Sequence, residues 1–289
     1  MSEKLKKCII CGGRVFKDYS EKVVRCEGCS LVVAKEIPTL KEIDDIYQKE
    51  YFFGKEYINY KADRFALEWN FKGRIKSLGH MIKPGDKIIE IGCAYGYFLN
   101  LVKDKVASHT GFDVTKDGVE HAKKQFGLNA TTEDFIKYDI KDNSVDNVFM
   151  WDVIEHLVHP DEYIEKIARV LKTGGRLALT TGDVDALLSR IQKGKWRMIH
   201  PPTHIYYFNP KTIRLLLQKY GLAIETTKYH SVNRNVDSIF NMMIGNKKAR
   251  KENTKFYDFC YSLAKKMKLD KMNVPINTFD IMQVVARKI

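Results

Sequence analysis

The sequence has no apolar run long enough to cross a bilayer, and its first residues, MSEKLKKC, are charged where a secretory signal would be apolar. Cysteine is scarce. Four of the six cysteines form two CxxC pairs, which leaves only Cys93 and Cys260 and excludes a disulfide framework. Internal repeats and low-complexity tracts are also missing from the sequence. We therefore expect a cytoplasmic protein without a transmembrane segment.

Acidic residues are in the minority, because 49 Lys and Arg face 36 Asp and Glu and give a formal net charge of +13. This balance suits an anionic substrate, nucleic acid or an anionic membrane surface, and it equally suits a basic soluble enzyme. Charge therefore does not select a function. The length of 289 residues favours one main domain with smaller appendages.

The N-terminal 37 residues carry two CxxC motifs separated by fourteen residues. This number and spacing of thiols is typical of a tetrahedral structural zinc site, and two short apolar pairs between the motifs predict a zinc ribbon of two strands. A redox dithiol is the alternative, but two paired motifs suit zinc better. The expected zinc ligands are Cys8, Cys11, Cys26 and Cys29.

The most informative stretch of the sequence is residues 83–99, KPGDKIIEIGCAYGYFL. A short apolar run at 87–91 leads into a loop with Gly92 and Gly96, and an apolar helix begins at Tyr97, which predicts the start of a βαβ unit. Glycine lets a ligand approach the backbone closely, so the loop is a candidate cofactor cradle. A dinucleotide-binding GxGxxG would fall on Gly92, Ala94 and Tyr97, so two of its three glycines are missing.

Strand-like and helix-like segments alternate after residue 83, which predicts a doubly wound, mostly parallel sheet. A segment at 38–82 precedes it as a helical linker or cap, and two insertions at 182–210 and 233–272 interrupt the alternation. The expected strands are 87–91, 108–113, 128–131, 146–151, 176–181, 223–229 and 279–287, and the expected helices are 62–82, 118–126, 160–171, one that starts after Asn209, and 255–267. We expect the apolar stripe of the helix at 62–82 to include Phe65 and Trp69.

The loop itself reads E-x-G-x-A-x-G from Glu90 to Gly96, and this pattern resembles motif I of the class I S-adenosylmethionine-dependent methyltransferases. The sequence departs from that motif at Ala94, where the family usually has its middle glycine. The resemblance covers about residues 83–230. It implies an α/β, Rossmann-like seven-stranded methyltransferase sheet, with 279–287 as the reversed seventh strand, in a domain spanning 83–289.

The resemblance also implies how S-adenosylmethionine would be held. Glu90, Gly92, Ala94 and Gly96 belong to the cradle, and Asp113 would accept hydrogen bonds from the ribose hydroxyls. Asp134 and Phe135 resemble the adenine site, and Trp151 would face the methionine part of the cofactor. Residue type alone does not separate Asp113 from a solvated strand-end residue, or Asp134 from a turn residue.

Methyl transfer requires a base only when the acceptor must lose a proton, and histidine suits that task at neutral pH. The resemblance places His156 at the rim of the active site. His204 lies in HPPTHIYYFNP, which resembles the cap motif of a bacterial and archaeal methyltransferase subgroup, many of whose members begin with a two-CxxC ribbon. We name His156 and His204 as candidate bases; an anchoring role for His204 is the alternative.

These features favour a methyltransferase for a small-molecule or glycan-type acceptor, acting on oxygen. The ribbon and a basic run, Lys247, Lys248, Arg250 and Lys251, keep an RNA-modifying methyltransferase as an alternative, although 142–157 lacks the Asn-Pro-Pro-Tyr type of motif. A cofactor-binding protein without turnover is another. The amphipathic basic segment at 256–271 either docks on an anionic membrane or packs on the sheet as a solvated helix, and we favour the second alternative.

Overall fold

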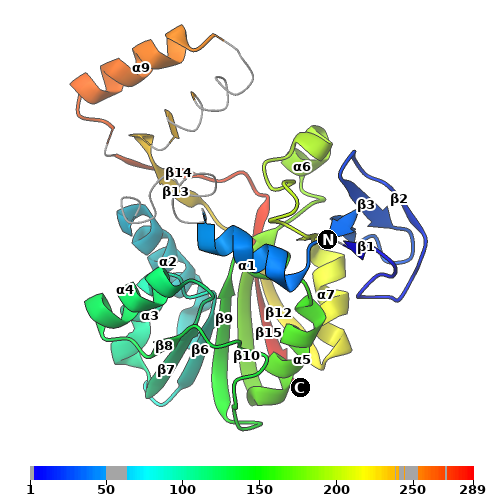
Figure 1. The fold of residues 1–289 in the computed structure, drawn as a ribbon. Coiled ribbons are helices and arrows are strands. Elements are labelled where there is room, and N and C mark those ends of the chain that lie inside the picture. Colours follow the sequence, from blue (N-terminus) through cyan, green and yellow to red (C-terminus); the bar gives the residue numbers. More distant parts are fainter. Residues whose placement is uncertain (1–2, 50–63, 238, 241–243, 245–252, 271) are drawn as a thin grey trace.

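The structure, a computed structural model, describes residues 3–49, 64–237, 239, 240, 244, 253–270 and 272–289 (Figure 1). The remaining residues include part of the expected linker at 38–82 and the basic run Lys247, Lys248, Arg250 and Lys251, which lie outside the described part. Among the described residues, no helix combines the length and the apolar character needed to cross a bilayer.

A seven-stranded sheet forms the centre of the molecule, with the order β12-β15-β10-β9-β6-β7-β8. β15 pairs antiparallel with both β10 and β12, and the other pairs in the sheet are parallel, so the reversed strand expected at 279–287 is confirmed. The strands are β6 (Lys87–Ile91), β7 (Ser108–Phe112), β8 (Ala130–Thr131), β9 (Val145–Trp151), β10 (Leu171–Gly182), β12 (Leu222–Tyr229) and β15 (Ile281–Lys288).

Helices cover both faces of this sheet (Figure 1). On one side lie α2 (Arg64–Leu78), η1 (Gly79–Met81), α3 (Tyr97–Val102), η2 (Lys103–Lys105) and α4 (Lys116–Phe126). On the other side lie α5 (Pro160–Val170) and α7 (Pro210–Lys219), and α1 (Leu40–Lys49) crosses above the sheet. Asn209 caps α7, because its side chain accepts from the Thr212 amide at 2.8 Å while Thr212 bonds back to the Asn209 amide.

The N-terminal ribbon shares a sheet with the cap insertion. The ribbon strands are β2 (Phe16–Asp18), β3 (Val23–Cys26) and β4 (Val32–Ala34), and β11 (Tyr206–Tyr207) of the cap pairs with β4. The two strands expected between the CxxC motifs are present as β2 and β3. A short pair, β1 (Glu3–Lys4) with β5 (Glu36–Ile37), closes the ribbon, and the cap also contains α6 (Leu187–Gln192) and η4 (Lys193–Lys195).

The second insertion leaves the main body through a two-stranded sheet of β13 (Val232–Asn235) and β14 (Asn273–Ile276), with α9 (Lys255–Lys266) beyond it. The expectation that this helix packs on the sheet is wrong for its apolar face. Phe256 is 72% exposed and Phe259 is 66% exposed. The helical period predicts one apolar face, but it does not determine what covers that face.

The stripe expected on α2 is also wrong at its N-terminal end, since Phe65 and Trp69 are largely exposed. Ala66, Phe71 and Leu78 are the residues of α2 that are buried. The helix carries apolar residues on more than one side, and contact with α3 selects the side with Phe71, whose ring lies 5.8 Å from that of Phe98.

Candidate functional site

The loop after β6 has the backbone that its glycines predict. Gly92 and Gly96 have φ values of 76° and 78°, in the left-handed region that glycine adopts without strain. Close packing requires glycine there as well: a Cβ on Gly92 would lie 2.3 Å from Val153 Cγ2, and one on Gly96 would lie 2.5 Å from Leu128 Cδ1. The loop is therefore clamped between α4 and the segment after β9.

Ala94, the departure from the family motif, also has a positive φ, 44°. A side chain in this region costs about 1 kcal/mol, so the position carries backbone strain that a glycine would lack. Asp113 holds the strained residue in place, because its Oδ2 accepts from the Ala94 amide at 2.7 Å. Its Oδ1 accepts from the Thr115 amide at 2.9 Å and from the Thr115 hydroxyl.

Glu90 lies in β6, two residues before Gly92, and is 1% exposed. Its Oε2 has no hydrogen-bond partner among the described residues. Burial, and then the charge of Asp113, raise the pKa of Glu90 well above its usual value, and Arg74 opposes this rise only in part. A buried carboxyl oxygen without a donor, next to a second acid, is a site that a cationic ligand would stabilise.

The structure places the residues expected around the rest of the cofactor along the same edge of the sheet. Asp134 is exposed after β8, and its Oδ1 accepts from the Ile136 amide at 2.9 Å. Phe135 is 2% exposed and packs between Phe112 and Tyr163. Trp151 ends β9 in an aromatic cluster, and its buried Nε1 has no hydrogen-bond partner among the residues that the structure describes.

Asp152, which follows Trp151, connects three elements. Its Oδ2 accepts from Arg74 Nη2 of α2 at 2.8 Å, and its Oδ1 accepts from Thr180 Oγ1 of β10 at 2.7 Å. Burial acts to raise the pKa of Asp152, but Arg74 and the Thr180 hydroxyl outweigh it and lower the pKa below its usual value. Asp152 also has a positive φ of 55°, an unusual backbone for a residue that is not glycine.

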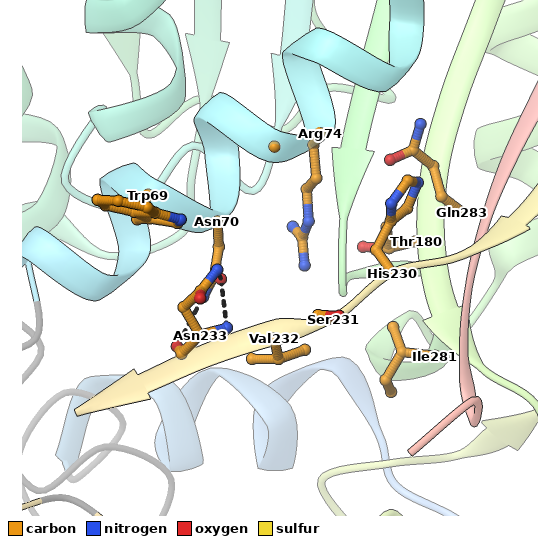
Figure 2. Close-up of a pocket in the computed structure, with 11 residues that line it drawn as sticks. Trp69, Asn70, Arg74, Thr180, His230, Ser231, Val232, Asn233, Ile281 and Gln283 are labelled. Atoms are coloured by element: carbon orange, nitrogen blue, oxygen red, sulfur yellow. Dashed lines mark hydrogen bonds between the residues drawn. The ribbon is translucent and has the colours of Figure 1, made fainter. Parts of the chain in front are cut away.

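A pocket adjoins this ion pair at the carboxyl end of β10 (Figure 2). Arg74 and His230 point into it, and Asn70 bonds to the Asn233 amide at its edge. His230 Nε2 is buried and has no hydrogen-bond partner in the described part of the chain. Burial, followed by the charges of Arg74 and Lys228, lowers the pKa of His230. The lining residues are Trp69, Asn70, Gly73, Arg74, Thr180, His230, Ser231, Val232, Asn233, Ile281 and Gln283.

The two candidate bases lie together, although they are 48 positions apart in the sequence. The rings of His156 and His204 are edge to face with centroids 4.3 Å apart, and both residues are buried. Burial, followed by the His200 charge, lowers the pKa of His156 to about 4, and burial with the neighbouring histidines lowers the pKa of His204 well below its usual value. Both imidazoles are therefore neutral near pH 7.

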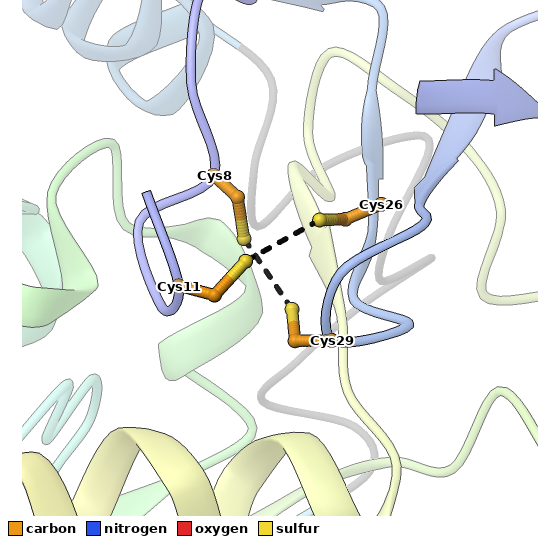
Figure 3. A group of neighbouring side chains, drawn as sticks. All are labelled: Cys8, Cys11, Cys26 and Cys29. Atoms are coloured by element: carbon orange, nitrogen blue, oxygen red, sulfur yellow. Dashed lines mark hydrogen bonds between the residues drawn. The ribbon is translucent and has the colours of Figure 1, made fainter. Parts of the chain in front are cut away.

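The four ribbon cysteines converge on one point (Figure 3). Cys8 Sγ lies 3.4 Å from Cys29 Sγ, Cys11 Sγ lies 3.5 Å from Cys26 Sγ, and all four sulfurs are within 4.8 Å of one another. A tetrahedral ion with Zn–S bonds of about 2.3 Å separates its sulfurs by about 3.8 Å. The thiols therefore fit a zinc ion in number, type and spacing.

Sequence reasoning missed Arg74, Glu155 and His230 as candidate site residues. Arg74 comes from α2, which precedes the recognisable motif, so no local pattern marks it. His230 directly follows β12, and a histidine at the carboxyl end of a strand is a signal that could have identified it. Glu155 stands next to His156 in the sequence and shares its burial.

The matched family profile is described as a methyltransferase domain and spans residues 62–227, more than half of the chain. A ubiquinone biosynthesis O-methyltransferase from Vibrio vulnificus is 27% identical over an alignment of 139 residues, with 41% of this chain and 59% of that protein covered. The chain thus spans less than two thirds of this relative.

Two solved structures show the same fold at low identity. A magnesium protoporphyrin IX methyltransferase from Synechocystis, solved with bound SAH, is 15% identical with a TM-score of 0.54 and covers 87% of this chain and 100% of its own. A SAM-dependent methyltransferase from Archaeoglobus fulgidus is 18% identical with a TM-score of 0.52, and the match covers 83% of this chain and 97% of that structure. From the profile match and the seven-stranded sheet with its reversed strand, the chain belongs to the class I S-adenosylmethionine-dependent methyltransferase family.

Proposed function

We propose that this protein binds S-adenosylmethionine over the loop from Gly92 to Gly96 and transfers its methyl group to the oxygen of a small-molecule or glycan-type acceptor. One observation carries the proposal: Asp113 holds the strained loop at Ala94, and the buried Oε2 of Glu90, just before the loop, has no donor among the described residues. The name of the Vibrio relative, an O-methyltransferase, supports oxygen as the acceptor atom.

The residues present suit a cofactor that carries positive charge on its sulfonium and amino groups. Glu90, Asp113 and Asp152 place carboxyl groups along the edge of the sheet where the loop begins, and Asp134 and Phe135 follow at the next strand. When bound, the cofactor supplies an electrophilic methyl group. The protein's part is then to hold the acceptor in line with that methyl, in a site from which water is excluded.

The acceptor would enter through the pocket between α2, β10, β13 and β15 (Figure 2). A hydroxyl acceptor must lose its proton, and the neutral His230, whose Nε2 has no partner among the described residues, is suited to take it. His156 and His204 stay proposed as candidate bases. Variants of each residue distinguish the three.

The cofactor is tested by calorimetric titration of the purified protein with S-adenosylmethionine. We expect saturable binding, and a folded protein that shows no heat of binding at millimolar cofactor would refute the proposal. The acceptor is tested by mass analysis after incubation with phenols, catechols and hydroxylated sugars. A product heavier by one methylene that is lost only in His230→Ala assigns the base to His230. Loss only in His156→Ala, or only in His204→Ala, assigns the base to that residue instead.

The ribbon is proposed to bind one structural zinc ion through Cys8, Cys11, Cys26 and Cys29. A segment this small buries too little apolar surface to fold by itself, so the metal would supply its folding free energy. Replacement by Co²⁺ provides the test: thiolate-to-cobalt charge-transfer absorption in the near ultraviolet is expected. Its absence from folded, cobalt-treated protein would contradict the assignment.

The exposed apolar face of α9 supports a second proposal, that the protein contacts an anionic membrane surface. On this face Leu263 and Met267 are 47% and 59% exposed beside Phe256 and Phe259. Lysines flank this face, which is the composition of a helix that lies in the surface of an anionic membrane. Co-sedimentation tests this contact with two kinds of vesicle, one of phosphatidylcholine alone and one in which about one lipid in three is phosphatidylserine. Phosphatidylserine is anionic and attracts lysine side chains. Binding only to the anionic vesicles, reduced in Phe256→Ser, is expected; equal recovery with and without vesicles would refute it.

A further inference from the structure

A second cluster of metal-ligating side chains lies where the cap meets the main sheet. Glu155 and His156 belong to η3 (Ile154–His156), directly after β9, and His204 comes from the cap. One ligand atom from each residue lies within 4.8 Å of the other two. The three residues are 2%, 8% and 5% exposed, so the cluster is enclosed by protein.

Both histidines are oriented by backbone carbonyl groups. His156 Nδ1 lies 3.0 Å from the Thr203 oxygen, and His204 Nδ1 lies 2.9 Å from the Met198 oxygen. A carbonyl oxygen only accepts hydrogen bonds, so Nδ1 carries the proton in each neutral ring and Nε2 keeps its lone pair. Metal-ligating histidines are commonly held by this arrangement, which fixes the tautomer and the direction of the ring.

The carboxyl group of Glu155 completes the cluster. Neither Oε1 nor Oε2 has a hydrogen-bond partner among the described residues, although the group is buried. The nearby Thr181 hydroxyl lowers the pKa of the carboxyl in part, against the larger effect of burial. The carboxyl oxygens and the two imidazole lone pairs are all acceptors, and they are buried together. Either a proton or a cation must stabilise such a cluster.

We propose that Glu155, His156 and His204 bind one divalent transition-metal ion of the zinc type, separate from the ion of the cysteine cluster. Two imidazoles and one carboxylate are a ligand set that Zn²⁺ accepts with a further ligand in the fourth position. His200 is placed to supply that ligand from the cap, since its ring centroid is 3.8 Å from that of His204.

The ion would fasten the cap to the carboxyl end of β9. The backbone already joins the two parts, because the Ile205 amide donates to the Glu155 carbonyl at 2.8 Å and the Ala34 amide donates to the Ile205 carbonyl at 2.8 Å. Bound metal would add three side-chain bonds to this junction. The cap would then be held between two metal sites, the cysteine cluster and the Glu155 cluster. A metal ion at the Glu155 cluster is independent of whether the protein transfers methyl groups.

The test is the zinc content of the full-length protein after equilibration with micromolar Zn²⁺ and removal of unbound metal, measured by mass spectrometry of the digested sample. Wild type is expected to hold one zinc ion per chain more than Glu155→Gln, and also more than His204→Asn. His159→Asn removes an exposed histidine near the cluster and is the matched control, which should retain the wild-type content. Equal content in wild type and folded Glu155→Gln would overturn the proposal.

Cobalt spectra of the wild type decide the question if the variants fail to fold. A nitrogen and oxygen site adds visible ligand-field bands without thiolate charge transfer, whereas the cysteine cluster contributes both. Cobalt binding with a component free of thiolate charge transfer supports the second site. A spectrum that saturates with thiolate bands alone would mean that Glu155 shares a proton with the histidines instead.

Discussion

The Asp113 carboxylate accepts a hydrogen bond from the Ala94 amide at 2.7 Å, and this bond ties the end of β7 to the loop after β6. It restrains the one loop position where the family glycine is replaced by a residue with a side chain. In the proposed complex the same carboxylate would also accept hydrogen bonds from the cofactor, so loop geometry and ligand binding would depend on one group.

Asp113→Asn is expected to weaken binding of S-adenosylmethionine by about tenfold to a hundredfold, since hydrogen bonds to a charged group contribute about 1.5–3 kcal/mol. The amide keeps one acceptor but presents an N–H group to either Ala94 or Thr115. Calorimetric titration measures the change. Asp117→Asn, an exposed acid at the start of α4, is the matched control and should bind as wild type does; a similar loss in both variants would mean that net charge alone is responsible.

Gly96→Ala should destabilise the fold by about 2–4 kcal/mol for two reasons. The new Cβ would lie within 3 Å of Leu128 and Ala122, and the positive φ at this position is unfavourable for alanine. Gly127→Ala has a similar φ of 64° but open space around the added methyl group. It should cost only about 1 kcal/mol. Urea unfolding of both variants separates the steric cost from the backbone cost, and equal losses would show that packing at Gly96 contributes nothing.

Asp280 connects the start of β15 to the cap: it is fully buried and accepts hydrogen bonds from Trp196 Nε1 at 2.7 Å and from the Arg197 guanidinium. Burial acts to raise the pKa of Asp280, but Arg197, Thr278 and Trp196 outweigh it, and the pKa is lowered below 3.8. The ionised carboxylate therefore contributes its full stability above the unfolded-state pKa, about 3.9. This contribution is lost as the pH falls through the lower, folded-state pKa.

Asp280→Asn should accordingly cost about 2 kcal/mol in the free energy of unfolding near neutral pH. The difference from wild type should stay constant between about pH 5 and 8 and shrink below about pH 4, where the wild-type carboxyl group takes up its proton. Urea unfolding at several pH values measures it. A difference that grows on acidification would contradict the lowered pKa.

Cys11→Ser should lower the thermal midpoint by about 5–10 °C, because loss of one ligand would weaken binding of the zinc ion proposed to stabilise the ribbon. Cys11 is the exposed member of the cluster, so the substitution leaves the core packing unchanged. Since β4 pairs with β11, we also expect faster proteolysis within the cap. Cys260→Ser, outside the cluster, is the control, and an identical midpoint in both variants would show that the cysteine cluster does not stabilise the fold.

Local sequence determined most of the sheet. Apolar runs broken by glycine marked the strands, and the E-x-G-x-A-x-G loop, whose glycines need a positive φ, placed the cradle after β6. The CxxC spacing marked the four-cysteine cluster, because ligands at that spacing lie close together through backbone geometry alone. These features depend on contacts between residues that are near in sequence or repeat at a regular period.

Tertiary structure alone decided which distant groups meet. The pairing of β4 with β11 joins the ribbon to the cap, and Arg74 reaches Asp152 from a helix outside every recognisable motif. It also buried His156 against His204 beside Glu155, and it left Phe256 and Phe259 exposed. Burial and partner choice follow from the packing of whole elements, and a residue's own sequence neighbourhood does not encode them.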